Sequence, residues 1–133
     1  MQPDTITLTV PARGEYAKTV RMAAAQLGSR IGMTYDEVDD VRIAAEEAFV
    51  YACDCTDEGE QVTFSFTVSD DSLGISVGPL PHCCAPSREP VKDTYAAFIL
   101  RSVCDGFDVV HDEGRCMLRL DCRMKSPSDP AGA

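Results

Sequence analysis

TYDEVDDVRIAAEEAFVYA, residues 34–52, decides the fold, because it carries both a helix start signal and a helical apolar repeat. The hydroxyl of Thr34 can accept a hydrogen bond from the backbone N–H of Glu37, whose carboxylate can reach back to the backbone N–H of Thr34. Acidic residues near this end favour the positive pole of the helix dipole. Apolar residues then recur three or four positions apart, which places them on one face: Val38, Val41, Ala45, Ala48, Phe49 and Ala52. The stretch therefore predicts an amphipathic helix from Tyr35 to Ala52.

Patterns on both sides of this helix predict the rest of a two-layer domain. A half-buried strand should precede it, since apolar residues alternate in TITLTV, residues 5–10, and Pro11 ends the run. The other expected elements are a first helix over 15–29 that ends at Gly32, a hairpin from 61–68 and 73–77, a third helix within 91–106 and a closing hairpin from 107–111 and 115–124.

Runs of adjacent strands form hairpins, so the sheet should be mixed and mostly antiparallel, with three helices covering one face. This arrangement is an α+β two-layer sandwich. In the third helix, Tyr95, Phe98, Ile99, Ser102 and Val103 are expected to share the packed face, and Gly106 is expected to end the helix. The proline-rich segment from Gly78 to Pro90 should be a long exposed loop.

Length, charge and cysteine usage limit the function classes. The chain has 133 residues, which predicts one domain over 1–125 followed by a disordered polar tail over 126–133. A net charge of −10 argues against direct nucleic-acid binding and is compatible with a basic protein partner. No apolar run approaches the roughly 20 residues of a membrane span, and the N-terminus does not have the pattern of a signal peptide, which predicts a cytoplasmic protein. Seven cysteines, an odd number, argue against a disulfide scaffold.

Four segments, in this order, resemble the bacterial anti-sigma factors of the serine-kinase type, which have the histidine-kinase-like ATPase fold. LTVPARGEYAKTVR resembles the family's opening strand and first helix, and MTYDEVDDVRIAAEEAF resembles its second helix with an E-A-x-x-N motif. FTVSDDSLGISV resembles the central hairpin, and FILRSVCDGFDVVHDEGRCMLRL resembles the last helix and closing hairpin. The resemblance covers residues 5–123 and implies the same two-layer fold.

The resemblance also implies a nucleotide site, of which three parts differ here. Glu47 matches the family's general base, but Tyr51 stands where an asparagine would hold Mg²⁺. Gly78 stands where an aspartate would accept a hydrogen bond from adenine, and REPVKDTYAAFIL, residues 88–100, lacks the glycines of the phosphate-binding lid. We therefore expect no cofactor. The alternative is a divergent serine/threonine-protein kinase that binds ATP and Mg²⁺ and uses Glu47 as its base.

For partners, the resemblance implies a sigma factor, an anti-anti-sigma factor, or both, and a homodimer. Arg21 matches the first-helix arginine that contacts partners, and a guanidinium suits that role because it can pair bidentately with a carboxylate. The expected function is regulation of transcription by protein–protein contact. A further alternative is a thiol or metal sensor on the same fold, built from Cys53, Cys55, His82, Cys83 and Cys84.

Overall fold

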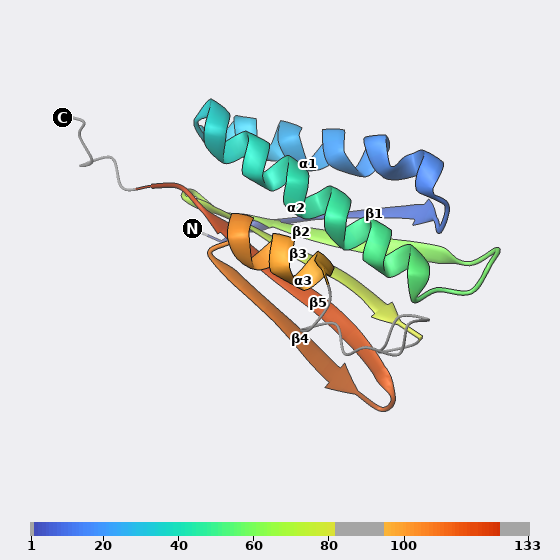
Figure 1. The fold of residues 1–133 in the computed structure, drawn as a ribbon. Coiled ribbons are helices and arrows are strands. Elements are labelled where there is room, and N and C mark those ends of the chain that lie inside the picture. The colour runs from blue at the N-terminus through green and yellow to red at the C-terminus, as the bar shows by residue number, and fades with distance from the viewer. Residues whose placement is uncertain (1, 82–94, 126–133) are drawn as a thin grey trace.

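The computed structural model describes residues 2–81 and 95–125, which form a sheet and helices in the expected order (Figure 1). The elements are β1 (Asp4–Pro11), the short 3-10 helix η1 (Gly14–Tyr16), α1 (Ala17–Ile31), α2 (Tyr35–Asp54), β2 (Gln61–Val68), β3 (Ser72–Leu80), α3 (Tyr95–Val103), β4 (Gly106–Asp112) and β5 (Arg115–Arg123). The expected disordered tail lies outside the described residues.

The five strands form one sheet in the order β1-β2-β3-β5-β4, and every neighbouring pair among them is antiparallel. All three helices cover the same face of this sheet (Figure 1). The structure thus confirms the α+β two-layer sandwich, with an antiparallel rather than a mixed sheet in the described part of the chain.

The start of α2 and the terminating glycine of α1 form where the sequence places them. The Thr34 hydroxyl accepts a hydrogen bond from the Glu37 N–H at 3.2 Å, and the Thr34 N–H donates to the Glu37 carboxylate at 2.8 Å. Helix α1 ends at Gly32, whose φ of 100° is a left-handed conformation that glycine adopts without a Cβ penalty. Helix α2 continues to Asp54, two residues beyond its expected end.

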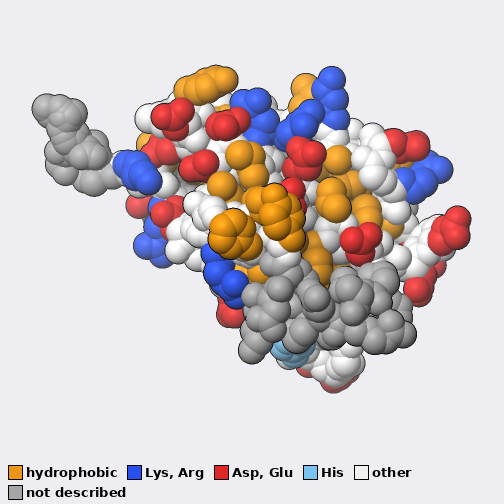
Figure 2. Space-filling model, viewed as in Figure 1, with side chains coloured by type: hydrophobic (Ala, Val, Ile, Leu, Met, Phe, Trp, Pro, Cys, Tyr) orange, Lys and Arg blue, Asp and Glu red, His pale blue; other side chains and the backbone are white. Residues whose placement is uncertain are grey.

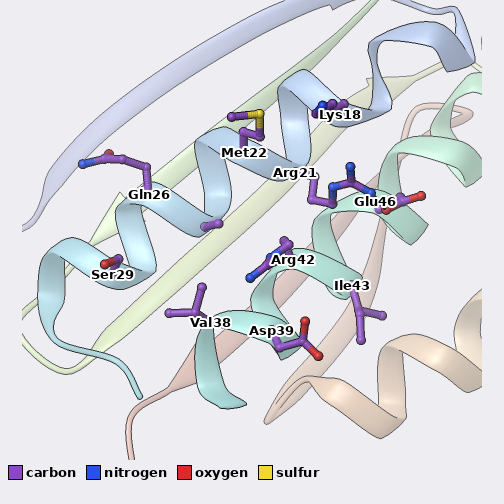
Figure 3. Close-up of a pocket in the computed structure, with 11 residues that line it drawn as sticks. Lys18, Arg21, Met22, Gln26, Ser29, Val38, Asp39, Arg42, Ile43 and Glu46 are labelled. Atoms are coloured by element: carbon purple, nitrogen blue, oxygen red, sulfur yellow. Dashed lines mark hydrogen bonds and ion pairs between the residues drawn. The ribbon is translucent and has the colours of Figure 1, made fainter. Parts of the chain in front are cut away.

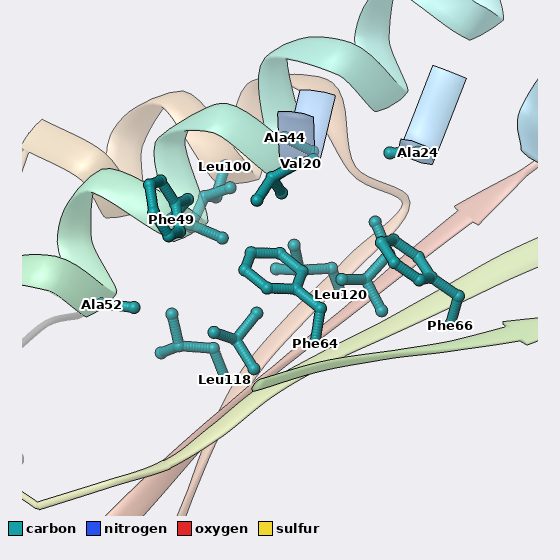
Figure 4. Close-up of a cluster of buried hydrophobic side chains, with 14 of the residues drawn as sticks. Val20, Ala24, Ala44, Phe49, Ala52, Phe64, Phe66, Leu100, Leu118 and Leu120 are labelled. Carbon is teal, nitrogen blue, oxygen red and sulfur yellow. The ribbon is translucent and has the colours of Figure 1, made fainter. Parts of the chain in front are cut away.

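The core lies between the helices and the sheet (Figure 4). Phe49 of α2 packs against Phe64 of β2, with ring centroids 6.2 Å apart, and Phe64 stacks on Phe66 at 5.9 Å. Leu100 of α3 and Leu118 of β5 are also fully buried. Burial of each large apolar side chain contributes about 1.5–3 kcal/mol, so this layer fixes α2 over the centre of the sheet.

Helix α3 packs through a different face from the one expected. Ala97 and Leu100 are buried, whereas Tyr95 and Phe98 are 75% and 66% exposed. Ala96 and Val103 also pack against the core, so of the expected face Val103 is confirmed, whereas Tyr95, Phe98 and Ser102 are exposed. Gly106 is the first residue of β4 and not the end of the helix.

Candidate functional site

The site implied by the sequence is centred on α2, where Glu47 and Tyr51 are one helical turn apart. Glu47 is half-buried. Burial, and secondly the negative charge of Glu46, raise the pKa of the Glu47 carboxyl above its ordinary value. A carboxylate with a raised pKa is a stronger base, so Glu47 has the chemistry of a proton acceptor.

Tyr51 is part of the hydrophobic core. Its side chain is only 4% exposed, and it belongs to the same buried cluster as Val77 and Leu80 of β3. A neutral phenol is a poor ligand for Mg²⁺, which prefers carboxylate, amide carbonyl and water oxygens. The residue at the expected metal-holding position therefore packs into the interior of the protein.

Gly78 has a backbone conformation that residues with a side chain rarely adopt. Strand β3 continues past the expected end at Val77 to Leu80, with a register shift against β5 between these two residues. Gly78 lies in this irregular segment with φ of 134°. A Cβ there would lie 3.0 Å from the carbonyl oxygen of Cys116, so a larger side chain would require the backbone to move.

Arg21, the expected partner-binding residue, lies between α1 and α2 and not on the outer face of α1. Its Nη1 donates to the Oε1 atom of Glu46 on α2 at 2.9 Å, and the two side chains are 34% and 39% exposed. Figure 3 shows the two side chains pointing toward each other between α1 and α2. Glu46 is thus a site residue that the sequence analysis missed, because its partner is 25 residues away in the chain.

Arg21 and Glu46 line a groove of about 710 Å³ between α1 and α2. Met22 of α1 and Ile43 of α2 also line it, and these two side chains are 58% and 36% exposed. Arg42 of α2 lies in the groove between the two helices (Figure 3). The structure therefore places a surface with mixed charged and apolar character beside the Arg21–Glu46 pair.

A second exposed apolar area lies over α2 and α3. Figure 2 shows hydrophobic side chains gathered there among charged ones. Val50 of α2 is 45% exposed and Phe98 of α3 is 66% exposed. Apolar side chains that gather at a surface are typical of protein-binding areas.

The thiol and metal alternative receives no support from the described residues. Cys55 is buried and Cys53 is half-buried, and burial raises the pKa of the Cys53 thiol, as does the nearby charge of Asp54. No group of three metal-ligating side chains occurs among the residues that the structure describes. His82, Cys83 and Cys84 lie outside them, as does most of the expected lid.

Within residues 2–81 and 95–125, none of the helices has the length and apolarity that crossing a membrane requires.

Comparison with known proteins gives one consistent family. Residues 10–119 match the family described as histidine kinase-like ATPase domain. The chain is 39% identical to the serine-protein kinase RsbW of Halalkalibacterium halodurans over 134 aligned positions, covering 85% of this chain and 80% of that protein. It is 27% identical to the serine-protein kinase RsbW of Bacillus cereus, over 85% of this chain and 81% of the relative.

A solved structure supports the fold. The crystal structure of the RsbU and RsbW domains of a Mycobacterium tuberculosis protein superimposes with a TM-score of 0.67 at 16% identity, over 93% of this chain. This chain spans 33% of that longer one, so the likeness concerns the fold alone. With the family match over most of the chain, these findings show that the chain belongs to the histidine kinase-like ATPase domain family, in the group of the anti-sigma serine-protein kinases.

Proposed function

We propose that the chain is an anti-sigma regulator that acts by protein–protein contact in a bacterial partner-switching pathway, and that it has lost its nucleotide site. The main support for the loss of the nucleotide site is the burial of Tyr51, which is 4% exposed. A residue that holds Mg²⁺ must present an oxygen to the phosphates of the nucleotide. Tyr51 lies instead in the hydrophobic core of the protein, which also contains Val77 and Leu80.

The backbone at Gly78 supports the same conclusion independently. Recognition of adenine requires a hydrogen-bond acceptor at this position, and Gly78 has no side chain to supply one. The close approach of the Cys116 carbonyl oxygen excludes a larger residue unless β3 is rebuilt. Loss of the metal contact and of the base contact removes two interactions that act at opposite ends of a nucleotide.

The proposed partners are a sigma factor and an anti-anti-sigma factor, and the regulator would act in the cytoplasm as a homodimer. Arg21 is the proposed partner-binding residue. Its ion pair with Glu46 holds the guanidinium at the edge of the groove between α1 and α2. An arginine held in place loses less conformational entropy when it binds a partner carboxylate.

A second candidate function is a divergent serine/threonine-protein kinase, and the environment of Glu47 favours it. Burial and the charge of Glu46 raise the pKa of this carboxyl, as is typical of catalytic bases. In this function Glu47 would accept the proton of a partner serine hydroxyl as the serine oxygen bonds to the terminal phosphorus of ATP, the bond from that phosphorus to the bridging oxygen breaks and ADP leaves. The same shift also arises for a structural carboxylate, so nucleotide binding decides between the two functions.

Isothermal titration calorimetry with ATP and Mg²⁺ tests the proposal. We expect no heat of binding at millimolar ATP, whereas the Halalkalibacterium halodurans relative, measured in parallel, should show binding. A micromolar dissociation constant with one site per chain would refute the loss of the nucleotide site. Transfer of labelled phosphate to a purified anti-anti-sigma factor, abolished in Glu47→Ala, would then establish the kinase function.

A further inference from the structure

Arg42 of α2 has an unsatisfied hydrogen-bond donor. Its Nε atom is buried and has no hydrogen-bond partner among the residues that the structure describes. A donor that is removed from water without a partner costs free energy, so such groups are rare in native proteins and need a physical reason. One reason is that a bound partner supplies the missing acceptor.

The groove around Arg42 can accept such a partner. Its volume is about 710 Å³, and α1 and α2 form its two walls (Figure 3). Met22 and Ile43 give it exposed apolar surface, one from each wall. A groove between two helices with apolar rims suits an amphipathic helix, which inserts side chains three or four positions apart.

The charge of the groove differs in sign from that of the whole chain. Three cationic side chains line it, Lys18, Arg21 and Arg42, against the two carboxylates of Asp39 and Glu46. Glu46 is already bound to Arg21. The groove therefore has a net positive charge on a chain whose net charge is −10, which favours an acidic ligand at this place.

We propose that the groove between α1 and α2 binds an acidic amphipathic helix of the partner protein, and that Arg42 receives one of its carboxylates. Because the Nε atom is buried in the free protein, the Arg42 side chain must turn toward the groove on binding. Its Nε–H and one Nη–H then donate to the two oxygens of a glutamate or aspartate side chain, in the bidentate geometry of such pairs. Apolar side chains on either side of that carboxylate contact Met22 and Ile43. This inference rests on the proposed function, because it assigns a binding surface to the same partner.

The groove proposal predicts an unusual combination of effects for Arg42→Met. Methionine keeps an unbranched stem of similar length but removes the charge and the buried donor. The variant should melt at the same temperature as the wild type or higher, since no unpaired donor remains. Its affinity for the partner should fall at least about tenfold, because the partner carboxylate would be buried without a counter-charge.

The experiment uses the purified sigma factor and the purified anti-anti-sigma factor encoded by the same genome, each titrated into the full chain. Arg42→Met is compared with Arg42→Lys, which retains the charge and loses the fork of donors, and with Arg30→Gln as control. Arg30 is exposed in the last turn of α1 and does not line the groove. In the wild type, the nuclear magnetic resonance signal of the Arg42 Nε–H should shift when the partner binds.

The possible outcomes distinguish failure of the groove proposal from failure of the proposed function. If the wild type binds one of the two proteins and Arg42→Met binds it equally well, the groove proposal is wrong and the proposed function stands. If Arg42→Met loses both stability and affinity, Arg42 holds α1 and α2 together and the proposal is also wrong. If the wild type binds neither protein, the proposed function fails, and the partner assignment of the groove fails with it. A changed oligomeric state in Arg42→Met would show a second copy of the chain as the occupant instead.

Discussion

Replacement of Tyr51 by asparagine tests whether this residue is structural or only blocks a nucleotide site. The Tyr51 side chain is 4% exposed, so the substitution removes an almost fully buried ring and introduces an amide. Loss of transfer free energy and the resulting cavity should together lower the free energy of unfolding by about 2–4 kcal/mol. For a chain of this size the melting temperature should fall by roughly 6–20 °C.

Urea unfolding followed by far-ultraviolet circular dichroism gives the free energy of unfolding, and calorimetry with ATP and Mg²⁺ measures binding on the same sample. Val50→Asn is the matched control, because it introduces the same side chain one residue earlier in α2, where Val50 is 45% exposed. This control should change the free energy of unfolding by no more than about 0.5 kcal/mol.

The structural role of Tyr51 would be refuted by one combination of results. If Tyr51→Asn is as stable as the wild type and binds ATP with Mg²⁺, the ring is only an obstacle in a site that is otherwise complete. A destabilised variant that does not bind nucleotide agrees with the structure, since Gly78 would still lack the base contact.

Two further predictions concern charged residues of α1 and α2. Arg21→Glu should weaken partner binding at least about tenfold, or roughly 1.4 kcal/mol. It should also lower the free energy of unfolding by up to about 1 kcal/mol, because it breaks an ion pair that is one-third exposed. The double variant with Arg21→Glu and Glu46→Arg should recover the urea midpoint of the wild type, because the ion pair is restored with reversed charges. Its affinity for the partner should stay reduced. For Glu47, the raised pKa means that the native state holds this proton more tightly than the unfolded state. The wild type should therefore lose stability relative to Glu47→Gln as the pH rises from about 4 toward 7. If the urea midpoints of the wild type and Glu47→Gln differ by the same amount at both pH values, this reasoning is wrong.

The elements of this fold could be predicted from the sequence because their signals are local. The capping box of Thr34 and Glu37 and the terminating glycine of α1 act within a few residues, and strand alternation has a fixed period. The prediction for α3 was partly wrong because spacing along the helix placed Tyr95 and Phe98 on the packed face, whereas in the folded chain Ala97 and Leu100 are buried.

The parts of the site that could not be predicted depend on contacts between distant segments. The ion pair of Arg21 with Glu46 joins two helices, and neither residue alone indicates which of its neighbours it faces. The positive φ of Gly78 occurs in the segment where the register between β3 and β5 shifts. Tyr51 could be recognised as a departure from the family motif, but its burial follows from the packing of α2 on β3.

The geometry of α2 explains how a nucleotide site can be lost while a partner surface is kept. Successive residues of an α-helix point about 100° apart, so adjacent residues belong to different sides. Arg42 and Glu46, four positions apart, line the groove toward α1, and Glu47 and Tyr51, also four apart, form the neighbouring row. A tyrosine in the second row fills the interior without altering the first. If the nucleotide site is lost, as proposed, selection for partner contact would therefore still preserve Arg21, Arg42 and Glu46.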